Sequence, residues 1–258
     1  MTQPQPVESV FSRSWELLTR NWIIIVPGIV IGLIMGAVVG ILAGIISIPA
    51  SVTSSDGTVQ AGAIAAAATA TLFSAFVAGI LAIVAFIATE AFTVGMAGAA
   101  WTRGTTTLAD GSAAFQEAAG RILIAAIGLL LLGIVAAVLT PFTFGLAFLA
   151  FVLFTLYTMP AAIVGGRPGF DALRESFQIT TQRFVPTLII AIIIGVISFV
   201  ASLLTLPLHF IPLLGPIVSA VITQIVVAYG TLVVVGEYLN LRAAGAIPPA
   251  GAPTVPSA

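Results

Sequence analysis

The sequence predicts an all-α membrane protein with six transmembrane helices and three amphipathic helices at the inner membrane surface. Of its 258 residues, 60% are hydrophobic and only 7% are charged, whereas soluble domains carry about 25% charged residues. Apolar stretches long enough to cross a hydrocarbon core of about 30 Å recur along the chain. We therefore predict one membrane domain over residues 7–243, flanked by disordered tails at 1–6 and 244–258.

The limits of the six spans follow from the apolar runs and from the polar or proline-rich turns between them. The run over residues 61–101 contains one charge, Glu90, and would form about 60 Å of helix, which is twice the hydrocarbon thickness. Its alanine-rich start is therefore expected to protrude from the membrane. The predicted spans cover about 22–49, 70–99, 122–139, 144–165, 185–205 and 217–239.

The basic residues set the predicted orientation. With six spans, all eight fall on one side of the membrane and the three opposite loops have none; they are Arg13, Arg20, Arg103, Arg121, Arg167, Arg174, Arg183 and Arg242. Basic residues favour the cytoplasmic side, so we expect both termini in the cytoplasm of a plasma-membrane protein. A different number of spans would scatter the arginines over both sides.

The surface helices form a pattern that recurs along the chain. Residues 169–190 begin as an amphipathic segment, in which Phe170, Leu173, Phe177 and Phe184 share one face, and are expected to continue without a break into an apolar span. The first half is expected to lie flat in the membrane surface. Residues 7–21 align with it, and residues 113–121 form a fainter copy. The pattern predicts a threefold internal hairpin repeat over 7–104, 110–168 and 169–243.

Arginines on the three surface helices are candidate contacts for anionic lipid headgroups. Each basic group near such a surface is worth roughly 1 kcal/mol. Setting the topology alone is the simpler role, and the two roles are compatible. The candidates are Arg13, Arg20, Arg121, Arg174 and Arg183.

A glycine ladder marks the first span. Its five members stand four residues apart, which is the spacing at which two helix backbones approach closely; they are Gly28, Gly32, Gly36, Gly40 and Gly44. Close packing inside one bundle is one interpretation, and a face for a second copy of the chain or for sliding is the other. The stripe drifts by about 40° per step, so one partner would follow only part of it.

Glu90 is the only ionisable residue well inside a predicted span. It lies thirteen residues before Arg103, about 20 Å along a helix. Carboxylates at such depths often mark an ion or substrate path, which makes a small transporter or channel the alternative function. The simpler interpretation is that the second span ends early and that Glu90 lies at the interface.

Several classes of chemistry lack their residues in this chain. The absence of cysteine excludes disulfides and thiol catalysis. His209 is the only histidine, and neither a metal-binding motif nor a glycine-rich phosphate loop is present. Glu237 lies close to the inner interface and is expected to be a structural charge. We therefore expect no enzymatic activity, cofactor, metal or nucleic-acid partner.

Short motifs carry a resemblance to a known family. Residues 159–164 (MPAAIV) close a span and are followed by Gly169, Ala172-Leu173, Ser176-Phe177 and Arg183; Val10-Phe11, Ser14-Trp15 and residues 238–242 (YLNLR) fit as well. Over nearly the whole chain this resembles the membrane domain of glycerophosphoryl diester phosphodiesterases and its stand-alone multipass relatives. In fused members that domain accompanies a catalytic barrel with several histidines and acidic metal ligands. This chain has one histidine and no room for the barrel, so phosphodiesterase activity is not expected.

The leading expectation is a non-catalytic integral membrane protein that organises lipid or a partner protein at the inner membrane surface. Its expected partners are membrane lipids, together with a partner protein or a second copy of the chain. The transporter alternative depends on Glu90.

Overall fold

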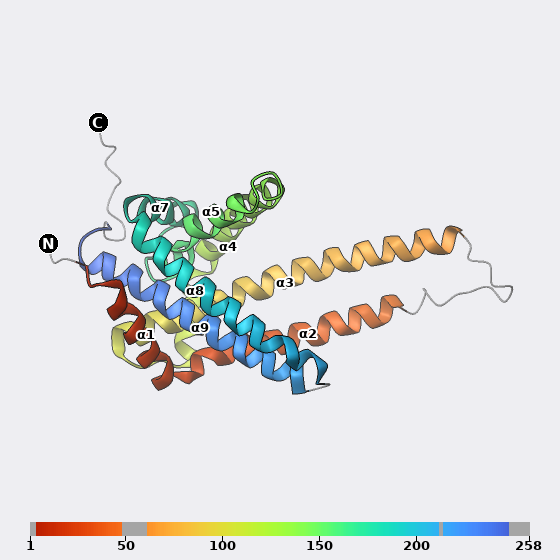
Figure 1. The fold of residues 1–258 in the computed structure, drawn as a ribbon, viewed down its shortest axis with the longest axis horizontal. Helices are drawn as coiled ribbons and strands as arrows, with labels where there is room; N and C mark the ends of the chain where they lie inside the picture. Colours follow the sequence, from red (N-terminus) through yellow and green to blue (C-terminus); the bar gives the residue numbers. More distant parts are fainter. Residues whose placement is uncertain (1–3, 48–60, 212–213, 248–258) are drawn as a thin grey trace. The chain divides into compact units, whose positions relative to one another are not determined.

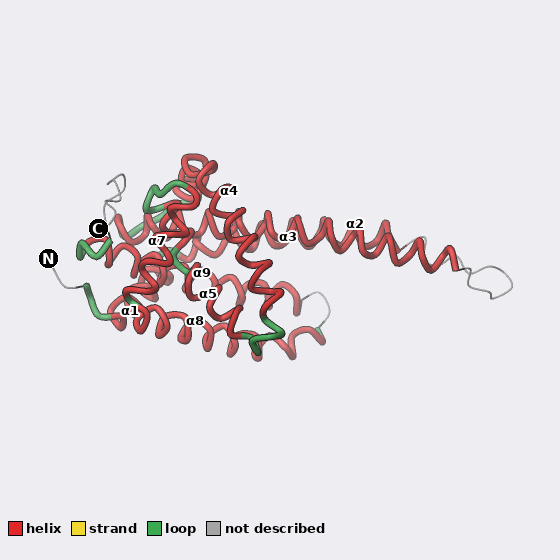
Figure 2. The backbone as a smooth tube through the Cα atoms, turned by 90° about the horizontal axis from the view of Figure 1, so that it is seen from above, coloured by secondary structure: helices red, strands yellow, loops and turns green. Residues whose placement is uncertain are grey.

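The computed structural model describes residues 4–47, 61–211 and 214–247, and all regular structure in these ranges is helical (Figures 1 and 2). The elements are α1 (Val7–Arg20), η1 (Trp22–Ile25), α2 (Val26–Ser47), α3 (Ala61–Arg103), α4 (Leu108–Leu139), α5 (Leu146–Thr155), α6 (Thr158–Ile163), α7 (Gly169–Gln182), α8 (Phe184–Thr205), η3 (Leu206–Phe210) and α9 (Leu214–Ala243).

Six helical stretches are long and apolar enough to cross a membrane, which confirms the predicted all-α multipass class. They are Trp22–Ile41, Thr71–Arg103, Leu108–Leu139, Leu146–Ile163, Phe184–Leu208 and Ile217–Ala243. Each overlaps one predicted span. The fourth consists of two helices, α5 and α6, because the chain turns between Thr155 and Thr158.

The chain divides into two compact units. The smaller unit comprises residues 28–89, which include most of α2 and the first part of α3. The larger unit joins the N-terminal 27 residues to everything from Glu90 onward. The predicted membrane domain is thus shared between two units, and the site described below lies in the larger one.

Two groups of helices build the larger unit. In one, α9 packs against α1, α6 and α8, and Figure 1 shows α8 and α9 running side by side in opposite directions. In the other, α4 packs against α5, α6 and α7. The buried core combines small residues with two fully buried tyrosines, Tyr157 and Tyr238. Small residues let helices approach closely where lipid, rather than water, surrounds them.

The surface helices α1 and α7 each bury one face, and several of their aromatic residues are exposed. The buried positions of α1 are Val10, Ser14, Leu17 and Leu18, and their counterparts 162 residues later in α7 are Ala172, Ser176, Ile179 and Thr180, all buried. Of the predicted shared face, Leu173 is buried whereas Phe170, Phe177 and Phe184 are exposed. Trp15 and Trp22 are exposed as well. These exposed rings still contact the protein, because Trp15 lies edge-on to Tyr229 with ring centroids 5.8 Å apart and Phe177 stacks on Phe154 at 4.9 Å.

Helices α1 and α7 also match in how they begin and end. Each has 14 residues and follows an extended proline, Pro6 or Pro168. Each ends at a non-helical residue, Asn21 with φ −122° and ψ 49° or Arg183 with φ −127° and ψ 46°. The predicted third copy has no such break, because α4 continues unbroken through residues 113–121. The threefold repeat is thus not shown by the structure.

The positions of the prolines explain where helices are interrupted. The expectation that residues 169–190 form one unbroken helix was wrong, because α7 ends at Gln182 and α8 begins at Phe184. Pro186 is the third residue of α8, where its missing N–H is no loss, whereas the interior of a longer helix would lose a hydrogen bond and clash with the ring. Pro27 similarly lies second in α2. Helix α4 contains no proline and continues.

Parts of both predicted disordered tails make contacts with the rest of the chain. The backbone N–H of Gln5 donates to Asn240 Oδ1 at 2.9 Å, and Asn240 Nδ2 donates to the carbonyl of Gln5 at 3.1 Å. At the other end, Ile247 is buried in the core of the larger unit. Residues 4–6 and 244–247 of the predicted tails thus lie within the described part of the chain, and disorder of the tails stays a prediction. Residues 1–3 and 248–258 lie outside the described ranges.

The turn between α4 and α5 satisfies its own polar groups. The N–H of Gly145 donates to the carbonyl of Thr140 at 3.0 Å, and Thr143 Oγ1 donates to that of Leu139 at 2.9 Å. Phe144 is 98% exposed and holds a left-handed conformation with φ 50°. Such a conformation costs a residue with a Cβ about 1–2 kcal/mol.

Replacing Phe144 with glycine should relieve this strain. Phe142 in the same turn is 79% exposed and has a negative φ, so Phe142→Gly is the matched control that also removes one exposed phenyl ring. We expect Phe144→Gly to be at least about 1 kcal/mol more stable than Phe142→Gly. Unfolding of the two purified variants in mixed detergent–dodecyl sulfate micelles measures the difference. Equal stabilities would show that residue 144 holds no strain.

Candidate functional site

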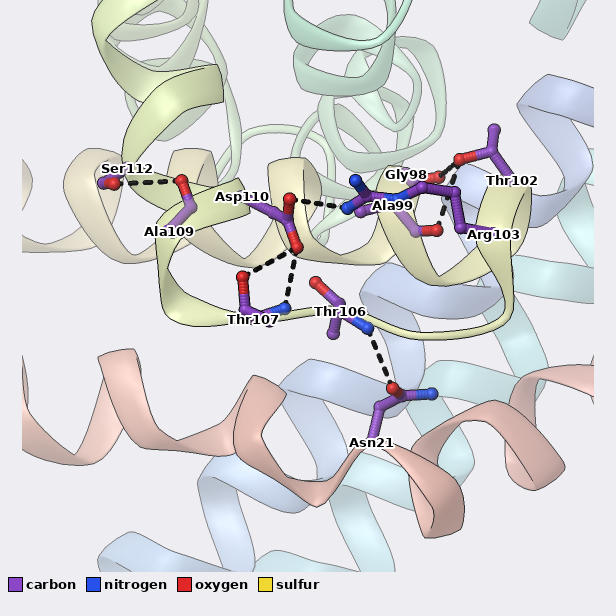
Figure 3. Close-up of polar contacts among 10 residues, drawn as sticks. All are labelled: Asn21, Gly98, Ala99, Thr102, Arg103, Thr106, Thr107, Ala109, Asp110 and Ser112. Atoms are coloured by element: carbon purple, nitrogen blue, oxygen red, sulfur yellow. Dashed lines mark hydrogen bonds and ion pairs between the residues drawn. The ribbon is translucent and has the colours of Figure 1, made fainter.

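Hydrogen bonds join helix ends of the larger unit that lie close to arginines in the sequence. Asn21, just after α1, accepts from the N–H of Thr106 at 3.0 Å (Figure 3). Its side chain also donates to the carbonyl of Gly104 at 3.2 Å. At the end of α9, Arg242 Nη1 donates to the carbonyl of Val164 at 3.2 Å. Together with the contact between Gln5 and Asn240, these bonds join segments that the predicted topology places on one side of the membrane.

Contacts within the α3–α4 connection fix the charged side chains of Arg103 and Asp110. Arg103 Nη2 lies 2.5 Å from Asp110 Oδ1, and the N–H of Thr107 donates to Asp110 Oδ2 at 2.8 Å. Figure 3 shows Asp110 between these two partners, with Asn21 approaching Thr106 from the neighbouring helix. Arg103 is therefore engaged in the connection itself.

A buried ion pair joins the loop before α7 to α7 and α9. The carboxylate of Glu175 accepts hydrogen bonds from Arg167 Nε and from the hydroxyl of Tyr238, the latter at 2.6 Å. Glu175 and Tyr238 are both buried, and Arg242 lies over the Tyr238 ring, 5.8 Å from its centroid. The three-residue spacing of Glu175 from Ala172 and its four-residue spacing to Ile179 place it on the buried face.

Glu237 is also buried, with 2% of its surface exposed, and it accepts a hydrogen bond from Asn240 Nδ2 at 3.1 Å. Arg183, one of the predicted lipid contacts, is only partly exposed and interacts electrostatically with Glu237 and Tyr157. Its charge therefore acts on the interior of the protein, at the junction of α7 and α8.

The other predicted lipid contacts lie nearer the surface. Arg13, Arg20 and Arg174 are exposed, and Arg13 lies over the ring of Trp101, 5.2 Å from its centroid. Arg121 is partly exposed and lies 3.9 Å from Glu117. The exposed arginines of α1 and α7 thus stand on the same helices as the exposed aromatic residues.

The glycine ladder makes no close contact where the structure describes its surroundings. A methyl group added to Gly32, Gly36 or Gly40 would meet nothing within 4 Å. Gly28 is buried, and the surroundings of Gly44 are not among those described. Packing of this ladder against a second molecule stays a prediction.

Other glycines make the close contacts that the ladder was expected to make. A methyl group on Gly236 would overlap the ring of Trp101, and one on Gly169 would overlap Ile124. The four-residue spacing did not reveal these positions, because close packing depends on which face of a helix meets a neighbour.

Glu90 lies within an unbroken α3 that continues to Arg103, and it is partly exposed. The helix therefore does not end early, although where the membrane surface crosses α3 stays a prediction. His209 is in η3, and its side chain is outside the described part. Among the described residues, no three His, Asp or Glu side chains come together as metal ligands.

Comparisons of the chain with protein-family models, with curated proteins and with solved structures found no match. The resemblance to the phosphodiesterase membrane domain therefore stays a prediction.

Removing the carboxylate charge of Glu175 should destabilise the protein strongly. The variant Glu175→Gln leaves the guanidinium of Arg167 buried without its charge partner, and breaking such a pair costs about 3–5 kcal/mol. The control Glu117→Gln removes a carboxylate that is 82% exposed and 3.9 Å from Arg121, which should change stability by at most about 1 kcal/mol. Thermal unfolding in detergent measures both, and similar shifts would contradict a stabilising role for the buried pair.

Proposed function

We propose that this chain is a non-catalytic integral membrane protein that binds anionic lipid at one membrane surface through the outward faces of α1 and α7. The observation that carries the proposal is the shared arrangement of these two helices. Each buries one face, which includes Ser14 in α1 and Ser176 in α7, and exposes both aromatic rings and arginines. An interfacial amphipathic helix inserts apolar side chains such as Trp and Phe at the boundary between headgroups and acyl chains, where arginines meet lipid phosphates.

The length and composition of the six apolar helices support a multipass protein. We further propose that the surface bearing α1 and α7 faces the cytoplasm of a plasma membrane, because the basic residues concentrate there. The contacts of Gln5 with Asn240 and of Arg242 with Val164 support this topology, since they join chain segments assigned to the same side. The transporter alternative rests on Glu90 alone.

Anionic lipid should bind less well when the exposed arginines are removed. Arg20 and Arg174 lie on α1 and α7, and at roughly 1 kcal/mol each their joint replacement by glutamine should weaken binding about 30-fold. The measurement is the amount of phosphatidylglycerol retained by the purified full-length protein after exchange from mixed phosphatidylcholine–phosphatidylglycerol nanodiscs.

The control variant is Glu8→Gln with Glu16→Gln, which removes two exposed negative charges from α1 and should increase binding. The preference should also weaken as salt rises, because exposed charges are screened. A wild-type protein that retains phosphatidylcholine and phosphatidylglycerol in the proportions supplied would contradict the proposal.

A further inference from the structure

We propose that Arg121, Arg242 and the loop of residues 164–167 form a binding site for a single phosphate group at the start of α7. The inference deepens the proposed function and rests on it, since it names one site and one chemical group. The shared chemistry is a phosphate ester or free phosphate. The site's position favours the phosphate of a lipid headgroup.

Three arginines from three elements meet at this short loop. Arg242 of α9 donates to the carbonyl of Val164 at 3.2 Å. Arg121 of α4 places Nη1 3.8 Å from the point where a Cβ on Gly166 would lie, and Arg167 belongs to the loop. The buried carboxylate of this cluster, Glu175, is already bound by Arg167 and Tyr238. The cluster therefore carries excess positive charge.

Arg121 is largely buried, whereas the carboxylate that it pairs with is exposed. Its side chain is only 28% exposed, and its closest carboxylate among the described residues is that of Glu117, at 3.9 Å and 82% exposed. Its Nε is buried and has no acceptor within the described part of the chain. A buried donor without an acceptor is unfavourable, and an exposed ion pair compensates little. The planar guanidinium fork matches the oxygens of a phosphate.

The backbone at the site suits an anion. Gly166 has φ +68°, a conformation that favours glycine, so the loop presents backbone rather than a side chain to Arg121. Helix α7 has 14 residues and begins without a side-chain cap, so its first N–H groups and its dipole add positive potential beside the arginines. Asp171 in the first turn is exposed and reduces this potential only in part.

The start of α1 lacks this positive charge, although the two helices are alike. Helix α1 has the same length as α7 and also follows an extended proline, Pro6. The polar groups beside its start are Gln5 and Asn240, with Glu237 bonded to the same asparagine. A carboxylate lies there in place of two arginines, so the start of α1 is unsuited to a phosphate.

The position of the cluster indicates the source of the phosphate. Arg121 directly precedes the apolar part of α4, Arg167 follows α6, and Arg242 lies in the last turn of α9. All three thus stand at the ends of predicted spans, at the depth of lipid headgroups. A phosphomonoester lipid carries more charge than a phosphodiester and should bind more tightly.

The test uses arginine modification by phenylglyoxal in the wild-type full-length protein, followed by peptide mass spectrometry. The protein is reconstituted in nanodiscs of phosphatidylcholine alone, of phosphatidylcholine with phosphatidic acid, or of phosphatidylcholine with inorganic phosphate in the buffer. We expect phosphatidic acid to slow the modification of Arg121 at least fivefold and that of Arg103, which is exposed and paired with Asp110, less than twofold. Equal protection by inorganic phosphate would support the site and assign it to free phosphate. Unchanged labelling of Arg121 in all three media overturns it.

A variant pair provides the second measurement. Arg121→Gln should lower the retained phosphatidic acid at least fivefold. Arg103→Gln removes the same charge from a side chain that is 57% exposed and paired with Asp110, outside the proposed lipid surface, and should lower it less than twofold. Arg121→Lys keeps the charge without the fork and should be intermediate. Equal losses in Arg121→Gln and Arg103→Gln would refute the site while leaving the proposed function intact. A wild-type protein without any preference for anionic lipid would refute the proposed function itself.

Discussion

The buried carboxylate of Glu175 is the interaction on which the rest of the larger unit depends. It accepts from Arg167 in the loop before α7 and from Tyr238 in α9, which lies 63 residues later in the sequence, so one side chain joins α7 to both. Removing two charges from water is expensive. The pair tolerates burial because both carboxylate oxygens accept hydrogen bonds.

Glu175 belongs to the buried face of α7. The same face buries Ala172, Ser176 and Ile179, whereas Phe170 and Phe177 are exposed. In water this arrangement would expose too much apolar surface. At the boundary between headgroups and acyl chains the exposed rings are favourable. The same side chains that would destabilise a soluble protein thus support a position in the membrane surface.

Composition, apolar run length and the placement of the arginines were sufficient to predict the helical class and all six candidate spans. The helix breaks were predictable in principle, since Pro27 and Pro186 mark two of them and α4 has no proline. The burial of Glu175 was less evident, because a carboxylate on an amphipathic helix is usually placed on its polar side. Periodicity locates one face of a helix, but it does not say which residues of that face the protein buries. The glycine ladder has the spacing for close packing, yet a methyl group on Gly32, Gly36 or Gly40 would meet nothing within 4 Å, so the packing of the ladder stays a prediction.

Helices α1 and α7 resemble each other in backbone form, but different contacts attach them to the rest of the protein. Their starts, lengths and ends agree, yet the position of Glu175 is occupied in α1 by Arg13, which is exposed and lies over Trp101. Helix α1 is instead held at its ends, by Gln5 with Asn240 and by Asn21 with the α3–α4 connection. Helix α7 is attached through its internal ion pair, so its start does not need uncharged hydrogen-bonding partners such as Gln5 and Asn240. The loop before α7 can therefore have arginines beside it, and the positive charge lies beside α7 rather than beside α1.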